Sequence, residues 1–196
     1  MKRATTSVVA IAITVFIALL IPAAAEIVYT PVNVSIPVGG YYYIDLNRDG
    51  IADFVLRSRL IQDYCQAGDG YIWTLSITPA QGNAVAIASG VNAAALVFGA
   101  PVGPNQSYLL STALMTELAW GNCGSGLFGE WLNLPNRYLG LLLRQTGANE
   151  IQYGWAKASE VAYIDPNGHL QTSVILLGFA YETVPGRVIA AGQTSD

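Results

Sequence analysis

The stretch from residue 45 to residue 53, Asp-Leu-Asn-Arg-Asp-Gly-Ile-Ala-Asp, has the spacing of a calcium-binding loop. Calcium prefers roughly six to eight oxygen ligands from carboxylates, carbonyls and water. A chain that wraps around so small an ion turns every second residue inward, and a glycine after the third ligand permits the sharp turn. We therefore predict a calcium site whose ligands are Asp45, Asn47, Asp49, the backbone carbonyl of Ile51 and Asp53.

The segments on both sides of this loop predict strands. Residues 41–44 (Tyr-Tyr-Tyr-Ile) and 54–56 (Phe-Val-Leu) are aromatic and β-branched, which favours strands. An EF-hand would also place a bidentate Glu at its twelfth position, which is Leu56 here. The loop therefore resembles the strand-joining calcium loops of integrin-type propeller repeats. An ordinary Asp-Gly hairpin turn is the alternative, but it leaves three close Asp side chains that repel one another without a cation.

The first 25 residues have the pattern of a signal peptide. A basic pair near the start is followed by the uncharged apolar run of residues 8–21 and by small residues suited to cleavage before Glu26. The run is shorter than the ~20 residues that span a bilayer, so a membrane anchor is the weaker alternative. We expect a secreted or periplasmic protein whose mature part, residues 26–196, forms a single domain without a membrane anchor.

The mature chain is acidic and contains two cysteines. Without the leader, seven basic residues stand against thirteen acidic ones, a formal net charge of −6. No basic patch is present, so we do not expect nucleic-acid binding. In an exported chain, two cysteines predict one disulfide, Cys65–Cys123, and two free thiols are the alternative.

Alternating and continuous apolar segments predict an all-β fold. Strands are expected at residues 27–36, 41–44, 54–56, 71–78, 84–89, 138–144, 151–157 and 172–183. Asp-Pro-Asn-Gly at 165–168 predicts a tight turn before the last of these strands. Apolar residues between 110 and 118 have helical spacing and suggest one short helix, and residues 121–136 suggest a long loop. Strands in succession with short turns predict a single β-sandwich or jelly-roll-like domain.

Segments in the last third of the chain resemble a recurring exported bacterial domain. They are Tyr-Gly-Trp-Ala at 153–156 and, after a hairpin, residues 178–186 and 189–192. With the Asp-rich loop, they are similar to domains common in proteins that bear the PEP-CTERM sorting tail handled by exosortases. The resemblance implies an exported surface domain without a defined activity. Residues 193–196 (Gln-Thr-Ser-Asp) lack the Pro-Glu-Pro, hydrophobic and basic parts of that tail, so we expect free secretion or periplasmic residence.

Three classes of function remain open. The first, which we favour, is a non-catalytic structural or adhesive module of a cell surface or matrix, with calcium rigidifying the hairpin. The second is a carbohydrate-binding module, since Trp120, Trp131 and Tyr138 lie in or beside the predicted long loop. An exposed aromatic there would stack on a sugar, but core packing is the favoured alternative for each Trp, because aromatic side chains bury a large apolar area. The expected partner in both cases is extracellular polysaccharide or surface matrix.

The third class is a glycoside hydrolase. That chemistry needs two carboxyl groups about 5–10 Å apart across a cleft. The available side chains are Glu117, Glu130, Glu160 and Glu182. Only Glu160 and Glu182 have a predicted way to meet, across the final hairpin, and two solvated strand carboxylates explain them equally well. We therefore do not expect an enzyme.

Overall fold

The computed structural model describes residues 26–144 and 150–195, apart from the side chains of Asp63 and Tyr64. The predicted signal peptide, residues 1–25, lies outside this part. Every regular element in the described ranges is a β-strand, which confirms the predicted all-β class. Within the same ranges, no helix has the length and apolarity needed to cross a membrane.

The strands include all eight that the sequence predicts. In chain order, those of the described part are β1 (Ile27–Ser35), β2 (Tyr41–Ile44), β3 (Phe54–Cys65), β4 (Gly68–Pro79), β5 (Ala84–Ser89), β6 (Asn92–Ala93), β7 (Pro101–Val102), β8 (Tyr108–Leu109), β9 (Ala113–Gly121), β10 (Gly126–Phe128), β11 (Arg137–Arg144), β12 (Ile151–Ile164), β13 (Leu170–Glu182) and β14 (Ile189–Ala190).

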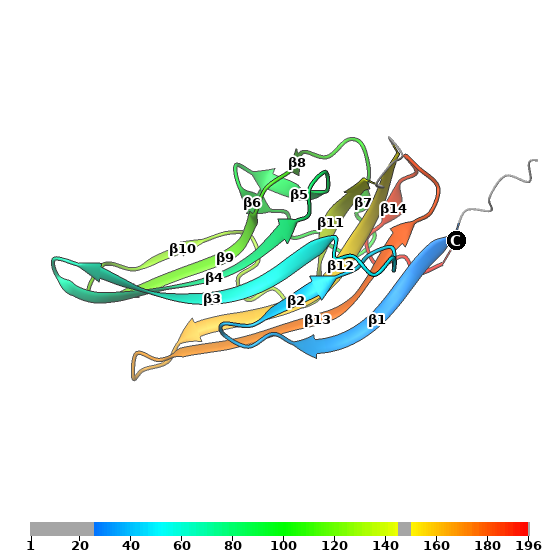
Figure 1. Ribbon diagram of the computed structural model, residues 1–196. Coiled ribbons are helices and arrows are strands. Elements are labelled where there is room, and N and C mark those ends of the chain that lie inside the picture. The colour runs from blue at the N-terminus through cyan, green and yellow to red at the C-terminus, as the bar shows by residue number, and fades with distance from the viewer. Residues whose placement is uncertain (1–25, 145–149, 196) are drawn as a thin grey trace, which may run out of the picture.

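One large sheet curls on itself to make the two layers of a sandwich (Figure 1). Its strands are hydrogen-bonded in the order β1-β13-β12-β11-β5-β6-β9-β4-β3-β2, with β8 beside β5 and β10 beside β9. The short strands β5 and β6 form the bend between the layers. All pairs in this sheet are antiparallel except β6 with β9, so the sheet is mixed.

The core lies between the inner faces of the two layers. On β4, the alternate residues Trp73, Leu75 and Ile77 are fully buried, as the predicted period of two requires. The facing strand β12 presents small side chains, among them Ala156 and Ala158, which leave room for the large ones opposite. This complementarity of large and small side chains lets the layers approach closely.

A second hydrophobic cluster, here called the outer cluster, covers the other face of β11–β13. Its buried members are Ile27, Val102, Tyr138, Tyr153, Trp155, Ala180, Ile189 and Ala191. The small sheet β7–β14 and the C-terminal segment form its lid, and the Trp155 indole N–H donates a hydrogen bond to the Gln193 carbonyl at 3.0 Å. The segments that carry the sequence resemblance thus lie together, with Trp155 beside Ala180 in the sheet.

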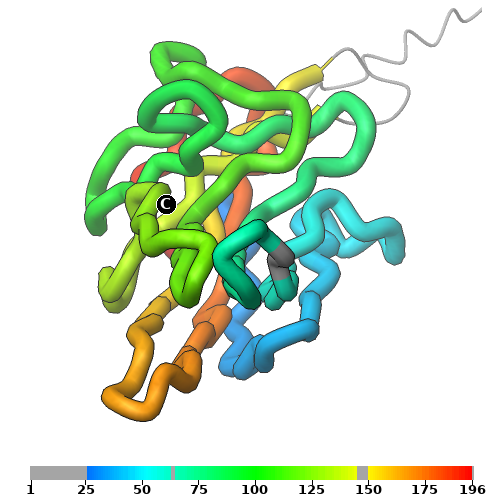
Figure 2. Tube along the Cα trace, turned by 90° about the vertical axis from the view of Figure 1, so that its left-hand side faces the viewer, coloured from blue at the N-terminus to red at the C-terminus, as the bar shows by residue number. Residues whose placement is uncertain are grey.

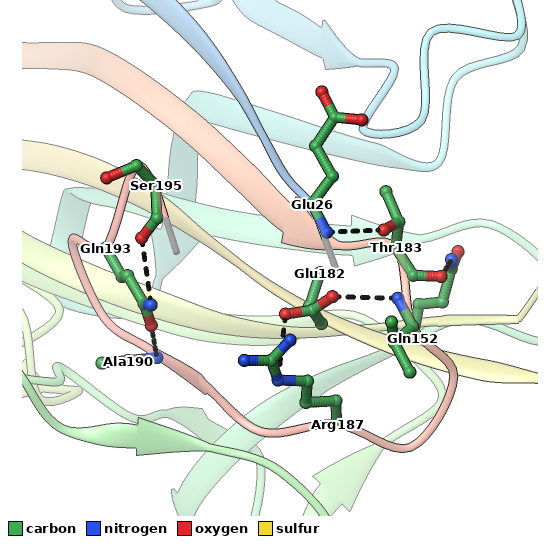
Figure 3. Close-up of polar contacts among 9 residues, drawn as sticks. Glu26, Gln152, Glu182, Thr183, Arg187, Ala190, Gln193 and Ser195 are labelled. Atoms are coloured by element: carbon green, nitrogen blue, oxygen red, sulfur yellow. Dashed lines mark hydrogen bonds and ion pairs between the residues drawn. The ribbon is translucent and has the colours of Figure 1, made fainter. Parts of the chain in front are cut away.

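The C-terminal segment is fixed to the start of β1 by polar contacts (Figure 3). The Glu26 backbone N–H donates to the Thr183 hydroxyl at 3.1 Å, and the Gln152 side-chain amide donates to the Thr183 carbonyl at 2.7 Å. Gln193 closes the end by accepting from the Ala190 N–H and donating to the Ser195 carbonyl. These contacts hold the lid of the outer cluster in place.

The short helix expected between residues 110 and 118 is wrong, because this segment belongs to strand β9. Its register with β4 shifts at Leu75, so that Met115 is an extra residue in the strand. A β-bulge of this kind places two consecutive residues on the buried side, here Met115 and Thr116. The bulge breaks the period of two and leaves inward-facing apolar residues three apart, as Met115 and Leu118 are, which imitates a helix.

Candidate functional site

The acidic loop, residues 45–53, joins β2 to β3 and closes on itself at its base. The Asp53 N–H donates to the Ile44 carbonyl at 2.8 Å, which continues the pairing of the two strands. Leu46 points inward and is fully buried. A Cβ added to Gly154 of β12 would lie 3.1 Å from a Leu46 methyl group, so Leu46 anchors the loop against the sandwich.

The exposed part of the acidic loop is held by its own side chains. The Asp45 carboxylate accepts hydrogen bonds from the N–H groups of Asp49 at 3.1 Å and Gly50 at 2.8 Å. The Asp49 carboxylate accepts from the Ile51 N–H and from the Asn47 side-chain amide. These three oxygen-bearing side chains therefore gather around one turn. A carboxylate has about four lone-pair sites, so amide bonds leave acceptor capacity for a cation.

Asp53 has a different environment from the other predicted ligands. Its carboxylate is buried and accepts the Leu46 N–H at 2.8 Å and the Asn83 side-chain amide at 3.3 Å. Burial raises the pKa of Asp53 above its usual value, and the hydrogen bonds partly oppose this shift. Across the described residues, no three His, Cys, Asp or Glu side chains form a group suited to a metal ion. Calcium in the loop stays a prediction.

Two of the three aromatic candidates are core residues. Trp131 is fully buried, and its indole N–H donates to the Ala93 carbonyl at 3.2 Å. Tyr138 is 5% exposed and packs edge-on against Trp155 in the outer cluster, with 5.3 Å between ring centroids. Neither ring is available to a ligand, so the core-packing alternative holds for both.

Trp120 is the aromatic candidate that remains open to solvent. It is half-buried near the end of β9, on the inner face that also carries Leu118 of the core. Tyr71 lies opposite it on β4, and the two rings stack with centroids 5.5 Å apart and planes 24° from parallel. The two stacked rings lie on the inner face of the layer, at the end where the facing layer no longer covers it.

A cleft opens beside this stack, between the two layers. The tips of the β3–β4 and β12–β13 hairpins extend side by side at this end of the molecule (Figure 2). On one side of Trp120 a cavity of about 360 Å³ is lined by Val38, Leu60, Tyr71, Trp120, Gly168, His169 and Leu170. On its other side a cavity of about 370 Å³ is lined by Leu118, Ala119, Trp120, Ser125, Gly126, Leu127 and Ile164. We call these two cavities together the mouth. Trp120 belongs to both.

A disulfide cross-links the two segments at one rim of the mouth. Cys65 and Cys123 are bonded, with 5.6 Å between their Cα atoms, as the sequence predicts. The bond ties the tip of the β3–β4 hairpin to the segment that follows Trp120. Gly70 makes the approach sterically feasible, because a Cβ there would lie 2.7 Å from the Cys123 Cβ. A disulfide is compatible with an extracellular or periplasmic protein.

The two strand glutamates Glu160 and Glu182 do not meet. The register places Glu160 opposite Val174, whereas Glu182 lies at the far end of β13, opposite Ile27. Both are fully buried in separate surroundings. Glu182 accepts the Val184 N–H at 2.9 Å and lies 3.6 Å from the Arg187 guanidinium, as Figure 3 shows. The pairing expected for a hydrolase is therefore not formed by these two residues.

Glu160 is a buried carboxyl, so the alternative of a solvated strand carboxylate is also wrong for this residue. Its Oε2 accepts the Asn133 N–H at 3.0 Å and the Thr116 hydroxyl at 3.4 Å, while its Oε1 has no hydrogen-bond partner among the described residues. Burial raises the pKa of Glu160 to about 7, and the two hydrogen bonds partly oppose the shift. The signal in the sequence is the run Ala158, Glu160, Ala162 at alternate positions, which places Glu160 on the apolar face.

Comparisons with other proteins add no relative: no family model, no curated protein and no solved structure matches this chain. The acidic loop and the mouth are therefore the features of the molecule that bear on its function.

Proposed function

We propose that the mature chain is an exported, non-catalytic module with a structural or adhesive role at a bacterial surface or matrix, and that it holds polysaccharide in the mouth. The observation that carries this proposal is the stack of Trp120 on Tyr71 in a cleft open between the layers. An aromatic side chain with a solvent-open face is the platform on which the apolar face of a sugar ring packs.

The lining of the mouth supports a carbohydrate ligand. The aliphatic side chains of Leu60 and Leu170 flank the aromatic pair, and His169 and Ser125 supply polar groups at the rim. Binding sites for small ligands combine such an apolar lining with a few polar groups that fix orientation. The positions of the buried carboxyls also support a non-catalytic role, because Glu160 and Glu182 lie at different places in the sheet and neither lines the mouth.

Glycan binding by variants of the mouth tests this proposal. A glycan array identifies the best glycan for the parent protein, and isothermal titration calorimetry measures its affinity. We expect Trp120→Ala and Tyr71→Ala each to weaken binding at least tenfold, about 1.4 kcal/mol, because each removes half of the stack. Tyr163→Ala is the matched control, since Tyr163 is an exposed aromatic outside the linings of the mouth. If the parent bound no glycan on the array, or if all variants bound with equal affinity, the adhesive proposal would be refuted.

The same proposal gives the acidic loop a structural role with bound calcium. The ligands would be Asp45, Asn47, Asp49, the carbonyl of Ile51 and Asp53, with an affinity around the ~10⁻⁴–10⁻³ M of extracellular modules. The convergence of the first three side chains on one turn supports this assignment. Because the ion binds only the folded loop, millimolar calcium should stabilise the protein.

Thermal unfolding with and without a chelator tests the calcium proposal. We expect chelation to lower Tm by several degrees in the parent and to have no effect in Asp49→Ala. Asp69→Ala is the control, since it removes an exposed carboxylate in the β3–β4 hairpin and should leave the calcium response intact. Identical melting of the parent in calcium and in chelator would mean that the loop is an ordinary turn.

Export is the remaining part of the proposal. The Cys65–Cys123 disulfide supports an oxidising compartment. Mass spectrometry of the protein recovered from periplasm or medium should find a chain that begins at Glu26. An intact leader on the recovered chain would contradict cleavage at this position.

A further inference from the structure

The outer face of β2–β4 carries a second group of exposed aromatic and polar side chains. Tyr41 and Tyr43 on the edge strand β2 are each 58% exposed, and their rings lie edge-to-face with centroids 5.1 Å apart. Arg57 is the cross-strand partner of Tyr41, and Arg59 follows two residues later on the same face of β3. Residues two apart on a strand are separated by about 7 Å along it.

Hydroxyl groups continue this face on the next strand. Ser76 lies opposite Arg57, Thr74 lies opposite Arg59, and Thr78 is opposite Val55. One row, of Tyr41, Arg57 and Ser76, thus crosses three adjacent strands, which are about 4.8 Å apart, and Arg59 with Thr74 forms a shorter row beside it. We call this surface the Tyr-Arg face, defined by Tyr41, Tyr43, Arg57, Arg59, Thr74 and Ser76.

The charge of the Tyr-Arg face is opposite to that of the protein. The mature chain has a formal net charge of −6, yet both guanidinium groups of this face are exposed. The ion pairs among described side chains involve other residues, namely His169 with Asp165 and Arg187 with Glu182. Two arginines without an acidic partner in the described structure, held at fixed spacing on a rigid sheet, attract carboxylates that repeat along a polymer.

We propose that the Tyr-Arg face binds an acidic polysaccharide built from uronic-acid units. Arg57 and Arg59 receive the carboxylates of the sugar units, and Tyr41 and Tyr43 pack against the sugar rings at the sheet edge. This inference adds a second binding surface to the proposed adhesive function. It rests on that function only in taking the ligand to be a polysaccharide. The mouth lies on the inner side of the same layer, so variants separate the two sites.

The ligand class follows from the combination of side chains. Arginine forms bidentate hydrogen bonds with planar carboxylates, which suits uronic acids. Tyrosine adds a rigid, amphipathic ring, and serine and threonine add short hydroxyl groups suited to sugar hydroxyls. A solvent-open sheet face accommodates an extended polymer rather than a small enclosed ligand.

Affinity electrophoresis and calorimetry with alginate and polygalacturonate, two polyuronates, test the proposal, with dextran as the neutral polymer. The full mature chain is compared with Arg57→Gln/Arg59→Gln, with Tyr41→Ala/Tyr43→Ala, and with Arg137→Gln/Lys157→Gln as the charge-matched control on the other layer. Thermal unfolding confirms that each variant is folded, which we expect because the substituted side chains of the Tyr-Arg face are exposed.

The supporting result has three parts. The parent binds a polyuronate but not dextran, and binding weakens as salt rises because the attraction is between exposed charges. The Arg57→Gln/Arg59→Gln variant loses at least tenfold in affinity, and the tyrosine variant loses several-fold. The control variant, Arg137→Gln/Lys157→Gln, stays within about twofold of the parent.

Other results overturn the proposal. They are the absence of binding to both polyuronates, equal affinity of the arginine variant and the control, or binding of DNA or anionic phospholipid vesicles as tight as that of the polyuronates. Because the mouth is tested separately, by Trp120→Ala with the glycan that the array identifies, failure at the mouth and failure at the Tyr-Arg face are distinguishable.

Discussion

Trp155 and Trp120 occupy two regions of the sandwich that are covered in different ways. Trp155 points away from the core, yet the C-terminal segment lies over it and leaves it 2% exposed. Trp120 points toward the core, yet the facing layer does not close over it, and cavities open on both sides. One ring contributes to stability and the other is accessible to a ligand.

The difference shows that cover decides the role of a strand side chain as much as the direction in which it points. At the outer cluster, β14 and the segment after it supply Ile189, Ala191 and the Gln193 carbonyl as a lid. At the mouth, the tip of the β12–β13 hairpin presents the small Gly168 and the exposed His169 across the opening. A covered aromatic adds to the core, whereas an uncovered one is a binding platform.

Alanine substitution of each tryptophan is expected to give the largest effects and to separate the two roles. Trp155→Ala should cost roughly 3–5 kcal/mol of the free energy of unfolding, the usual range for a buried Trp that leaves a cavity. Trp120→Ala should cost roughly 1–2 kcal/mol, because only part of its area is buried. Urea denaturation of both variants measures the difference.

The two substitutions should also have opposite effects on glycan binding. Trp155→Ala should keep the affinity for glycan where it is still folded, whereas Trp120→Ala should lose it. If Trp120→Ala proved the more destabilising of the two, the mouth would be part of the closed core rather than a site.

Much of the fold follows from local sequence patterns. The alternation of Trp73, Leu75 and Ile77 gives the buried face of β4 directly. The turn at 165–168 forms as predicted, with the Gly168 N–H donating to the Asp165 carbonyl at 2.9 Å and the Asp165 side chain accepting from the Asn167 and His169 N–H groups. The disulfide follows from two cysteines together with the predicted signal peptide, which favours an oxidised pair.

What could not be predicted depends on contacts between segments far apart in sequence. The bulge at Met115 arises from pairing between β9 and β4, and no local propensity records it. The lid over Trp155 and the gap beside Trp120 depend on where the C-terminal segment and a hairpin tip lie. The burial of Glu160 depends on the loop that brings Asn133 over it. Propensity assigns a strand, but tertiary packing assigns what covers it.

Removal of the disulfide is expected to have the next largest effect on stability and to loosen the mouth. Cys65→Ala/Cys123→Ala should lower the free energy of unfolding by roughly 2–4 kcal/mol, because the cross-link closes a long loop. It should also weaken glycan binding, since the bond fixes the segment next to Trp120. Calorimetric unfolding and glycan titration measure the two effects, and unchanged glycan affinity would show that the rim does not depend on the cross-link.

Gly70→Ala gives a finer test of the same rim. The added methyl group would lie 2.7 Å from the Cys123 Cβ, so the strand and the disulfide must move apart. We expect a loss of about 1–3 kcal/mol, the usual cost of overpacking. An unchanged free energy of unfolding in Gly70→Ala would contradict the close approach of this strand to Cys123.

The smallest effect concerns two buried carboxyls whose covers differ. The C-terminal segment brings Arg187 to Glu182, whereas the loop over Glu160 brings an N–H group and no cation among the described contacts. Because the pKa of Glu160 is about 7 in the folded protein, against 4.5 as its ordinary value, the folded state holds a proton that the unfolded state releases. The contribution of protonated Glu160 to the free energy of unfolding is therefore fully present below pH ~4.5 and is lost as pH rises toward ~7.

Glu160→Gln removes this ionisation and should flatten the pH dependence over that window. Above pH ~7 the variant should be more stable than the parent by roughly 1–3 kcal/mol, whereas the two should be similar at about pH 4. Glu182→Gln is the control, because it neutralises an equally buried carboxyl that already has a cationic partner, and the fall between pH ~4.5 and ~7 should persist in it. Urea denaturation at several pH values measures the curves. A parent curve without this fall would mean that the cover over Glu160 admits water, and the contrast between the two covered regions would then disappear.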